Sequence, residues 1–300
     1  MPALSFVTTQ IPIQAAISTY ASRVLTTASP LDKVRLTRAA VKSWETSRTP
    51  GPTVTPPDRP SRPVLPKIIP PSEMPSVKRS NVPSNVYYLH SLAHVELNAI
   101  DLCFDTMLRF ESVLPAKDRD EWFEDWLSIA SDEARHFKYL HDRLLALGSF
   151  YGELPAHDII WKSADVSKDS LRERLALGQL VAEARGLDAG PKLAERLIGS
   201  GDNDSAATVR QIADEEVRHV QLGVKWFLKE CERVMTDPIR TFHDIALRLS
   251  NPGAFAQPFN EQRRRQAGLT PEWYMPVAEE MERQRKERTK SQSTAHELRS

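Results

Sequence analysis

The chain has 300 residues, of which 40% are hydrophobic, and its 40 basic residues balance its 40 acidic residues. This length fits one large domain or two small ones. Because a nucleic-acid-binding protein usually has an excess of basic residues, the neutral charge predicts no nucleic-acid partner. The two cysteines, Cys103 and Cys231, are too few for a disulfide-rich secreted fold and indicate a reducing compartment.

The N-terminal residues carry very little charge. The first 31 residues contain no acidic residue and a single basic residue, Arg23. Organelle transit peptides are richer in arginine, so we expect a flexible N-terminus over residues 1–28 of a cytoplasmic protein, with a mitochondrial targeting peptide as the alternative. No run of about 18 apolar residues occurs, so the sequence predicts no transmembrane helix and no membrane partner.

A helix followed by a proline-rich strap is expected over residues 29–83. Ser29 before Pro30 is a helix-start signal, and the helix should continue to about Trp44. Eleven of the 22 prolines lie between residues 50 and 83, and a segment so rich in proline cannot form a helix. The strap is either a linker or an arm that lies on the main domain. Such an arm could be anchored by four apolar residues, Val64, Leu65, Ile68 and Ile69.

Residues 84–236 have the hydrophobic periodicity of a four-helix bundle. The long helices are expected over residues 84–113, 117–147, 168 to beyond Glu183, and 204–234. A long connection over residues 149–167 separates the second helix from the third. The third helix should bend or break at Gly186, Gly190 and Pro191, with a short helix over residues 192–198 after the break.

Two further segments complete the predicted organisation. Residues 237–288 are expected to form a C-terminal helical extension, with helices over residues 238–249 and 271–288. Residues 289–300 are polar and lack apolar periodicity, so we expect a disordered tail there.

A single carboxylate lies in the middle of the apolar stripe of each long helix. In the first helix, Glu96 lies between Ala93 and Ile100 on the face that should point to the core. A lone ionised carboxylate in a core is very costly unless it is paired or binds a metal ion. The corresponding residues of the other three helices are Glu133, Glu183 and Glu216.

Two of these glutamates begin a Glu-x-x-His motif. Glu133 is followed by His136, and Glu216 by His219, and side chains three residues apart project from the same side of a helix. The resulting order, Glu then Glu-x-x-His repeated once, is the ligand order of ferritin-like di-iron and di-manganese proteins, which also need one crossover connection. The sequence therefore predicts an all-α, ferritin-like four-helix bundle. Its predicted metal ligands are Glu96, Glu133, His136, Glu183, Glu216 and His219.

The charge of this ligand set favours two divalent cations, because four glutamates carry four negative charges. Mixed carboxylate and imidazole ligands suit iron, or manganese as the alternative, better than magnesium or calcium, and the lack of cysteine argues against structural zinc. Two interpretations without a functional metal site stay open. The glutamates could instead form buried ion pairs with Arg135 and Arg218, or the bundle could be a relic that no longer binds metal.

Several segments of the chain resemble a ferritin-like family of unknown function, whose members are distant relatives of a di-iron tRNA hydroxylase. The first is the run LHSLAHVELNAIDL at residues 89–102, and the second is DEARH at residues 132–136. The others are residues 151–158, 183–188, 258–260 and 267–269. The resemblance covers about residues 30–275 and implies a ferritin-like core with a di-metal site at the same six residues.

The expected function is that of a non-haem di-iron or di-manganese oxidoreductase, a monooxygenase or oxidase that activates O2 to oxidise a small organic substrate. Glu133 and Glu216 would bridge the two ions. An electron-donor protein is a candidate partner, and the oligomeric state stays open. A ferroxidase or iron-handling protein, and a non-enzymatic helical scaffold with a vestigial metal site, are the alternatives.

Other residues are expected to support the metal site. In a pseudo-symmetric bundle, Asp132 could accept a hydrogen bond from His219, and Asp214 or Glu215 could accept one from His136. We expect His90 and His94 to be hydrogen-bonding or surface residues rather than metal ligands. The long connection could provide a substrate lid or a simple cap for the bundle through Tyr151, His157 and Trp161.

Overall fold

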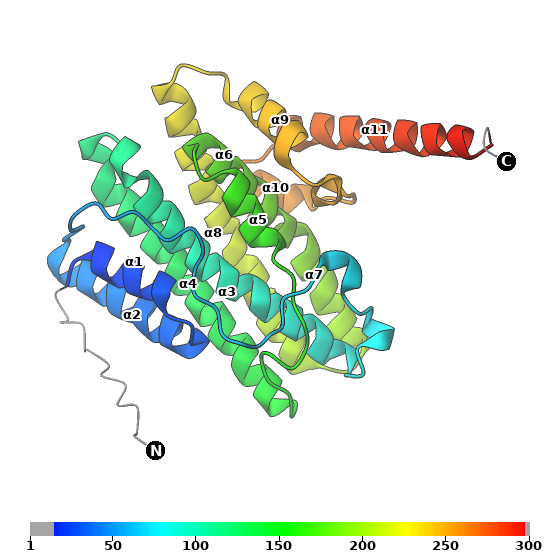
Figure 1. Cartoon of the computed structure of the whole chain (residues 1–300), viewed down its shortest axis with the longest axis horizontal. Coiled ribbons are helices and arrows are strands. Elements are labelled where there is room, and N and C mark those ends of the chain that lie inside the picture. The colour runs from blue at the N-terminus through cyan, green and yellow to red at the C-terminus, as the bar shows by residue number, and fades with distance from the viewer. Residues whose placement is uncertain (1–14, 298–300) are drawn as a thin grey trace. The chain divides into compact units, whose positions relative to one another are not determined.

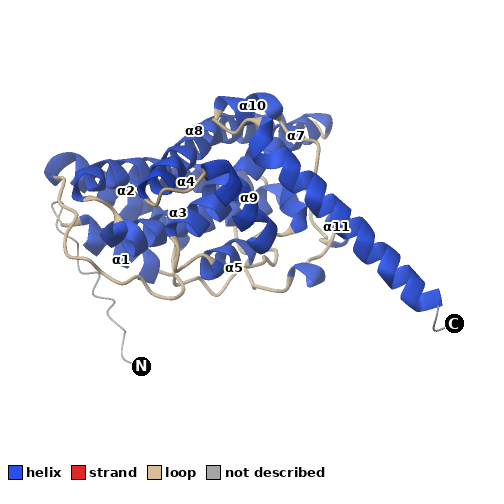
Figure 2. Cartoon of the chain, turned by 90° about the horizontal axis from the view of Figure 1, so that it is seen from above, coloured by secondary structure: helices blue, strands red, loops and turns tan. Residues whose placement is uncertain are grey.

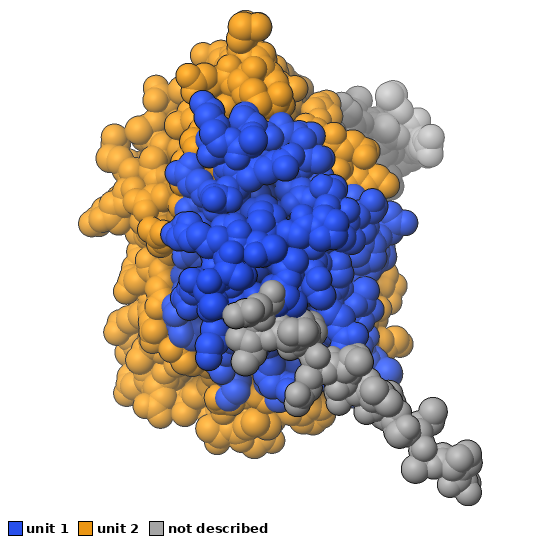
Figure 3. Space-filling view, turned by 90° about the vertical axis from the view of Figure 1, so that its left-hand side faces the viewer, with its two compact units in different colours: residues 1–65, 96–138 blue, residues 66–95, 139–300 orange. Residues whose placement is uncertain are grey.

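The computed structural model describes residues 15–297, and no β-strand forms within them (Figures 1 and 2). The all-α prediction is therefore confirmed. None of the helices in this range is both long enough and apolar enough to cross a membrane. The chain divides into two compact units, which we describe separately (Figure 3). The first unit comprises residues 1–65 and 96–138, and the second comprises residues 66–95 and 139–300.

The first unit contains two N-terminal helices and most of two long helices. Its elements are α1 (Ile17–Thr26), α2 (Pro30–Ser47), the C-terminal part of α3 (Ser84–Phe110) and the N-terminal part of α4 (Arg119–Ala146). The start of α2 is as predicted, because the backbone N–H of Asp32 donates to the Ser29 hydroxyl at 3.3 Å. The two long helices match their predicted ranges to within a few residues.

The predicted flexible N-terminus is wrong for the residues that form α1. This helix buries Ile17, Tyr20 and Val24, whose spacing places them on one face, and it packs against α2. Its start carries no side-chain cap, so no helix-start signal precedes it in the sequence. Residues 1–14 of the predicted flexible segment lie outside the described residues.

A buried ionic cluster joins α2, α3 and the first part of the strap. Lys33 Nζ lies 2.5 Å from Asp101 Oδ1, and both side chains are fully buried. Arg62, from the strap, pairs with the other oxygen of Asp101 and donates a hydrogen bond to Asn98 at 2.6 Å. Burial lowers the pKa of the Lys33 amine, and the positive charge of Arg62 lowers it further.

The strap is held by this cluster and by backbone contacts, whereas three of the four predicted apolar anchors are exposed and only Ile69 is half-buried. Val64 is 95% exposed, and Leu65 and Ile68 are also exposed. Within the second unit, backbone hydrogen bonds from Ile69 to Ala156 and from Ala156 to Lys67 fix the strap to the long connection. Because proline lacks a backbone N–H group, the backbone hydrogen bonds to the long connection are made by two non-proline residues of the strap, Lys67 and Ile69.

The second unit contains the remaining helices. They are α5 (Ile159–Val166), α6 (Leu171–Leu175), a π-helical segment (Ala176–Glu183), α7 (Ala184–Gly199), α8 (Asn203–Arg233), α9 (Pro238–Leu249), α10 (Glu261–Gln266) and α11 (Pro271–Glu297). Helix α5 forms inside the predicted long connection. Helix α8 packs against α7, the π-helical segment, α6, α9 and α10, so it is the centre of this unit.

The predicted break of the third bundle helix does not occur. The π-helical segment and α7 follow one another without interruption, and α7 continues through Pro191. A Cβ atom at Gly190 would lie only 2.6 Å from the Cβ atom of Ala213 on α8, so the glycine permits close packing of the two helices. The close packing of α7 and α8 offsets the stability lost with the hydrogen bond that Pro191 cannot donate.

The C-terminal extension is longer than expected. Helix α9 has the predicted range, whereas α11 runs to Glu297, so the predicted disordered tail is wrong for residues 289–297. Residues of high helix propensity and ion pairs one turn apart, such as Arg283 with Glu287 at 2.6 Å, explain the extra length. Residues 298–300 lie outside the described residues.

A second buried ion pair attaches α10 to α7. Arg264 is 2% exposed and donates to both oxygens of Asp188, at 3.0 and 2.7 Å. Its guanidinium group lies 4.6 Å from the ring centre of Tyr274 and 4.7 Å from that of Phe259. The backbone N–H of Asn260 also donates to Asp188 at 2.7 Å. We call this arrangement the Asp188 clamp.

Candidate metal centre

Three of the predicted ligands meet in the first unit. Glu96 lies on α3, and Glu133 and His136 lie on α4, with at most 2% of any of these residues exposed. Each offers one ligand atom, and these atoms lie within 4.8 Å of one another. The His136 Nδ1–H group donates to Glu96 Oε2 at 3.2 Å and lies 3.8 Å from Glu133 Oε2. We call these residues the first triad.

The protons of the first triad are held unusually tightly. Burial raises the pKa of the Glu96 carboxyl well above its ordinary range, and the negative charge of Glu133 raises it further. Burial alone would lower the pKa of His136, but hydrogen bonds and charge from Glu133 and Glu96 outweigh it and raise this pKa to about 12. In the absence of a cation, protons therefore neutralise this group of acids.

The other three predicted ligands meet in the second unit. Glu183 ends the π-helical segment, and Glu216 and His219 lie on α8. Their ligand atoms also lie within 4.8 Å of one another. His219 Nδ1–H donates to Glu216 Oε2 at 3.1 Å, and both of these side chains are buried, whereas Glu183 is half-buried. We call these residues the second triad.

Each triad fits a divalent transition-metal ion. It offers two carboxylates and one imidazole, which is a donor set suited to iron or manganese. In both triads the atom that faces the carboxylates is Nδ1, so a cation would take the place of the Nδ1 proton. Three protein ligands leave coordination positions open for an exogenous molecule. Cys103 and Cys231 are buried thiols and belong to neither triad.

The arginines that could have formed buried ion pairs are not buried. The Arg135 side chain is 34% exposed and pairs with Asp132 at 2.9 Å, one turn earlier on α4. Arg218 on α8 is exposed. A half-buried and an exposed guanidinium group are poor partners for glutamates inside a core, so the ion-pair interpretation loses support.

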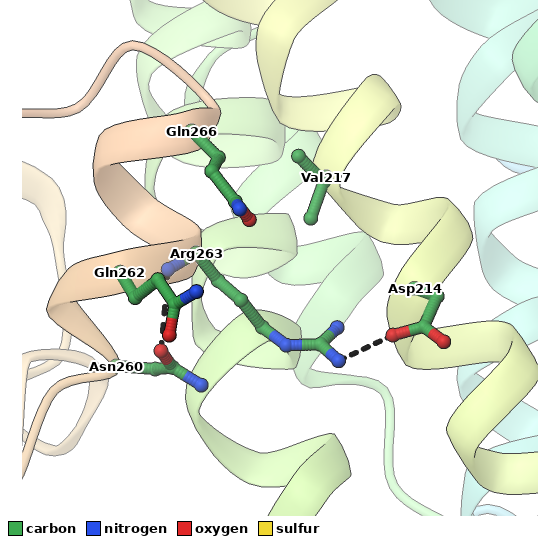
Figure 4. A pocket seen from close by; sticks show the side chains of 6 residues that line it. All are labelled: Asp214, Val217, Asn260, Gln262, Arg263 and Gln266. Atoms are coloured by element: carbon green, nitrogen blue, oxygen red, sulfur yellow. Dashed lines mark hydrogen bonds and ion pairs between the residues drawn. The ribbon is translucent and has the colours of Figure 1, made fainter.

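The supporting role predicted for Asp214 beside His136 is wrong. Asp214 is 67% exposed and pairs with Arg263 of α10. Both residues line a surface pocket, where Arg263 points at Asp214 (Figure 4). Glu215 accepts a hydrogen bond from Gln211 at 3.1 Å. The proposed roles of Asp132 and Glu215 beside the imidazoles stay predictions. The other residues of the pocket are Val217, Asn260, Gln262 and Gln266, none of which is a predicted ligand.

Two histidines of α3 hold the long connection in the second unit. His94 Nε2–H donates to the His157 backbone carbonyl at 3.2 Å, so its Nδ1 must accept the hydrogen bond from the Tyr151 hydroxyl at 2.8 Å. His90 Nε2 accepts from the backbone N–H of Gly152 at 2.9 Å. The hydrogen-bonding role predicted for both histidines is therefore confirmed.

These contacts favour the cap over the mobile lid. Burial lowers the pKa of His90 to about 4, against an opposing effect of Glu153, so the ring is neutral and can accept from the backbone. His90 is 1% exposed and His94 is 5% exposed, and Trp161 of the same connection is 2% exposed. A segment fixed by one buried and two partly buried hydrogen bonds would have to break all three to open.

Gln179 is a buried polar residue that the sequence interpretation missed. It is 1% exposed and lies in the π-helical segment, one turn before Glu183. A lone amide in the otherwise apolar run ALGQLV, at helical spacing from a predicted ligand, was the available signal. This signal is weak, because an uncharged side chain in a core is less conspicuous than a carboxylate.

These features define an all-α protein with two Glu/Glu/His triads, of which the first is fully buried and the second is buried except for Glu183. The chain belongs to the family described as "Protein of unknown function (DUF455)", whose profile matches residues 26–275. It is 32% identical over 212 residues to an uncharacterised protein of Haemophilus influenzae, which covers 69% of this chain and 73% of that relative. No solved structure matches the chain significantly.

Proposed function

We propose that the two triads together form one di-metal centre in a ferritin-like bundle, and that the protein is a non-haem oxidoreductase that activates O2 to oxidise a small organic substrate. Iron is the proposed metal, with manganese as the alternative. The observation that carries the proposal is the repeated triad: each unit contains a Glu/Glu/His set, in which only Glu183 is not fully buried, and the ligand atoms of each set lie within 4.8 Å of one another.

Two further observations support the union of the triads into one centre. The ligands occur in the chain in the order Glu, Glu-x-x-His, Glu, Glu-x-x-His, which is the order in ferritin-like carboxylate proteins. Four glutamates also match the charge of two divalent cations.

The side chains of the protein would hold, neutralise and shield the metal. Glu133 and Glu216 are the proposed bridging ligands, Glu96 with His136 would complete one ion, and Glu183 with His219 the other. When bound, two ferrous ions would supply two electrons to O2, and an electron-donor protein would return them before the next turnover. The burial of the triads keeps bulk water away from a reactive oxidant.

Anaerobic loading with ferrous iron, followed by exposure to O2, tests this proposal directly. We expect about two irons per chain, as in other two-metal sites, with optical and Mössbauer spectra of a coupled diferric centre. One iron per chain, or none, would contradict the proposal and favour a scaffold with a vestigial site. Many irons per chain, without turnover of an organic substrate, would point to iron storage.

Metal binding should release protons and become stronger as the pH rises. In the metal-free protein the raised pKa values of His136, about 12, and of Glu96 keep protons on the first triad at neutral pH. A cation must displace them, so its affinity should rise about tenfold per pH unit for each proton released. Calorimetry in two buffers of different ionisation enthalpy measures that number. An affinity independent of pH between about 6 and 8 would contradict this prediction.

A further inference from the structure

The π-helical segment buries a single polar side chain. Its first six residues, Ala176 to Val181, are all buried, and Gln179 is the only one with a polar side chain. Among the described residues, no hydrogen-bond partner is found for Gln179 Oε1, although the atom is inaccessible to solvent. A buried amide oxygen that lacks a partner is costly, and in a native protein such a group calls for an explanation.

The position of Gln179 places it next to the second triad. It precedes Glu183 by one turn on the same face of the segment. Across from it, a Cβ atom at Gly223 of α8 would lie 2.1 Å from Gln179 Cβ and 2.7 Å from its Cγ. Gly223 follows His219 by one turn. The glutamine therefore occupies space that an ordinary residue at position 223 would fill, one turn from both ligand-bearing positions.

The backbone around Gln179 is itself unusual. A π-helix is rare in proteins, and π-helical turns are frequently found at functional sites. Here the π-helical segment begins after α6 and ends at Glu183, a proposed metal ligand. The wider turn, the missing Cβ at Gly223 and the buried amide occur together. This combination costs stability, which a role in ligand binding would explain.

We propose that the side-chain amide of Gln179 is the hydrogen-bonding group for the small exogenous ligand, O2 or a small anion, at the open position of the ion held by the second triad. This inference rests on the proposed metal centre. An amide can present either its N–H or its oxygen when it turns about its last torsion, so it suits a donor or an acceptor. Gln179 is thus a positioning residue and not a metal ligand.

Azide binding to the diferric protein tests this role without any knowledge of the substrate. Gln179→Met keeps the length and the unbranched shape of the side chain but removes its hydrogen-bonding groups. We expect unchanged iron content and an azide dissociation constant raised about tenfold, measured from the azide-to-iron optical band. The matched control is Leu180→Met, which introduces the same side chain at the next buried position and should leave azide affinity unchanged.

Thermal melts of the metal-free variants provide a second measurement. Because the Gln179 oxygen has no partner among residues 15–297, metal-free Gln179→Met should melt at the wild-type temperature or above it. A clear fall in its melting temperature would show that the amide serves packing or folding and would overturn the inference. Full iron content with unchanged azide affinity would overturn the inference alone, whereas a wild-type protein that binds no iron would overturn the proposed metal centre as well.

Discussion

Glu133→Ala and Glu216→Ala are expected to remove most of the bound metal and yet leave the metal-free protein folded. Each glutamate is a proposed bridging ligand, so its loss takes a donor from both ions. In the metal-free state Glu133→Ala also relieves charge repulsion, because the charge of Glu133 raises the pKa of Glu96 beyond the effect of burial. Metal analysis per chain and thermal melts after chelation measure the two effects.

Glu96→Ala and Glu183→Ala serve as matched comparisons, because each of these glutamates would bind one ion. We expect them to retain more metal than the two bridging variants. If the glutamates instead form structural ion pairs, their removal should destabilise the metal-free protein. Removal of the partner of a buried cation costs about 3–5 kcal/mol of unfolding free energy. A loss of that size in metal-free Glu216→Ala would contradict the di-metal account.

Asp101→Asn should be the most destabilising conservative substitution in the first unit. The carboxylate is fully buried and pairs with both Lys33 and Arg62. Asparagine keeps the shape but removes the negative charge, so the Arg62 guanidinium group and the Lys33 amine would lose their shared counter-ion in a buried site. We expect the free energy of unfolding to fall by about 3–5 kcal/mol, measured by urea denaturation of the metal-free protein.

The control for Asp101→Asn is Glu124→Gln in the same unit. Glu124 pairs with Arg48 at 3.1 Å, but both side chains are more than half exposed. Exposed pairs contribute about 0–1 kcal/mol, so this variant should unfold close to the wild-type denaturant concentration. Equal losses of unfolding free energy in the two variants would contradict the prediction that the buried Asp101 cluster contributes more stability than an exposed ion pair.

The long helices could be predicted because their apolar spacing extends over many turns. The start of α2 followed from Ser29 and Pro30, and α9 appeared over its whole predicted range. The errors lie where packing outweighs local signals. Helix α1 lacks a side-chain cap and forms by burial against α2, and α7 continues through Pro191 because Gly190 allows α8 to approach.

The ligands of the candidate site could be predicted because a core carboxylate is a conspicuous exception. Glu96 and Glu183 stood out against apolar neighbours, and the triads formed within each unit as the spacing suggested. The supporting residues could not be predicted so well. Asp214 is predicted only from pseudo-symmetry, as an alternative to Glu215, but the partner that decides its role, Arg263, comes from a distant part of the chain.

The Asp188 clamp determines where a shortened version of this protein can end. A chain cut before Phe259 would lose Asn260 and Arg264 and would leave the carboxylate of Asp188 buried without its cation. Asp188 is five residues beyond Glu183, so the damage would lie on the helix that follows a proposed ligand. Helix α11 still buries Met281, which makes the following residue the earliest sensible end for expression trials.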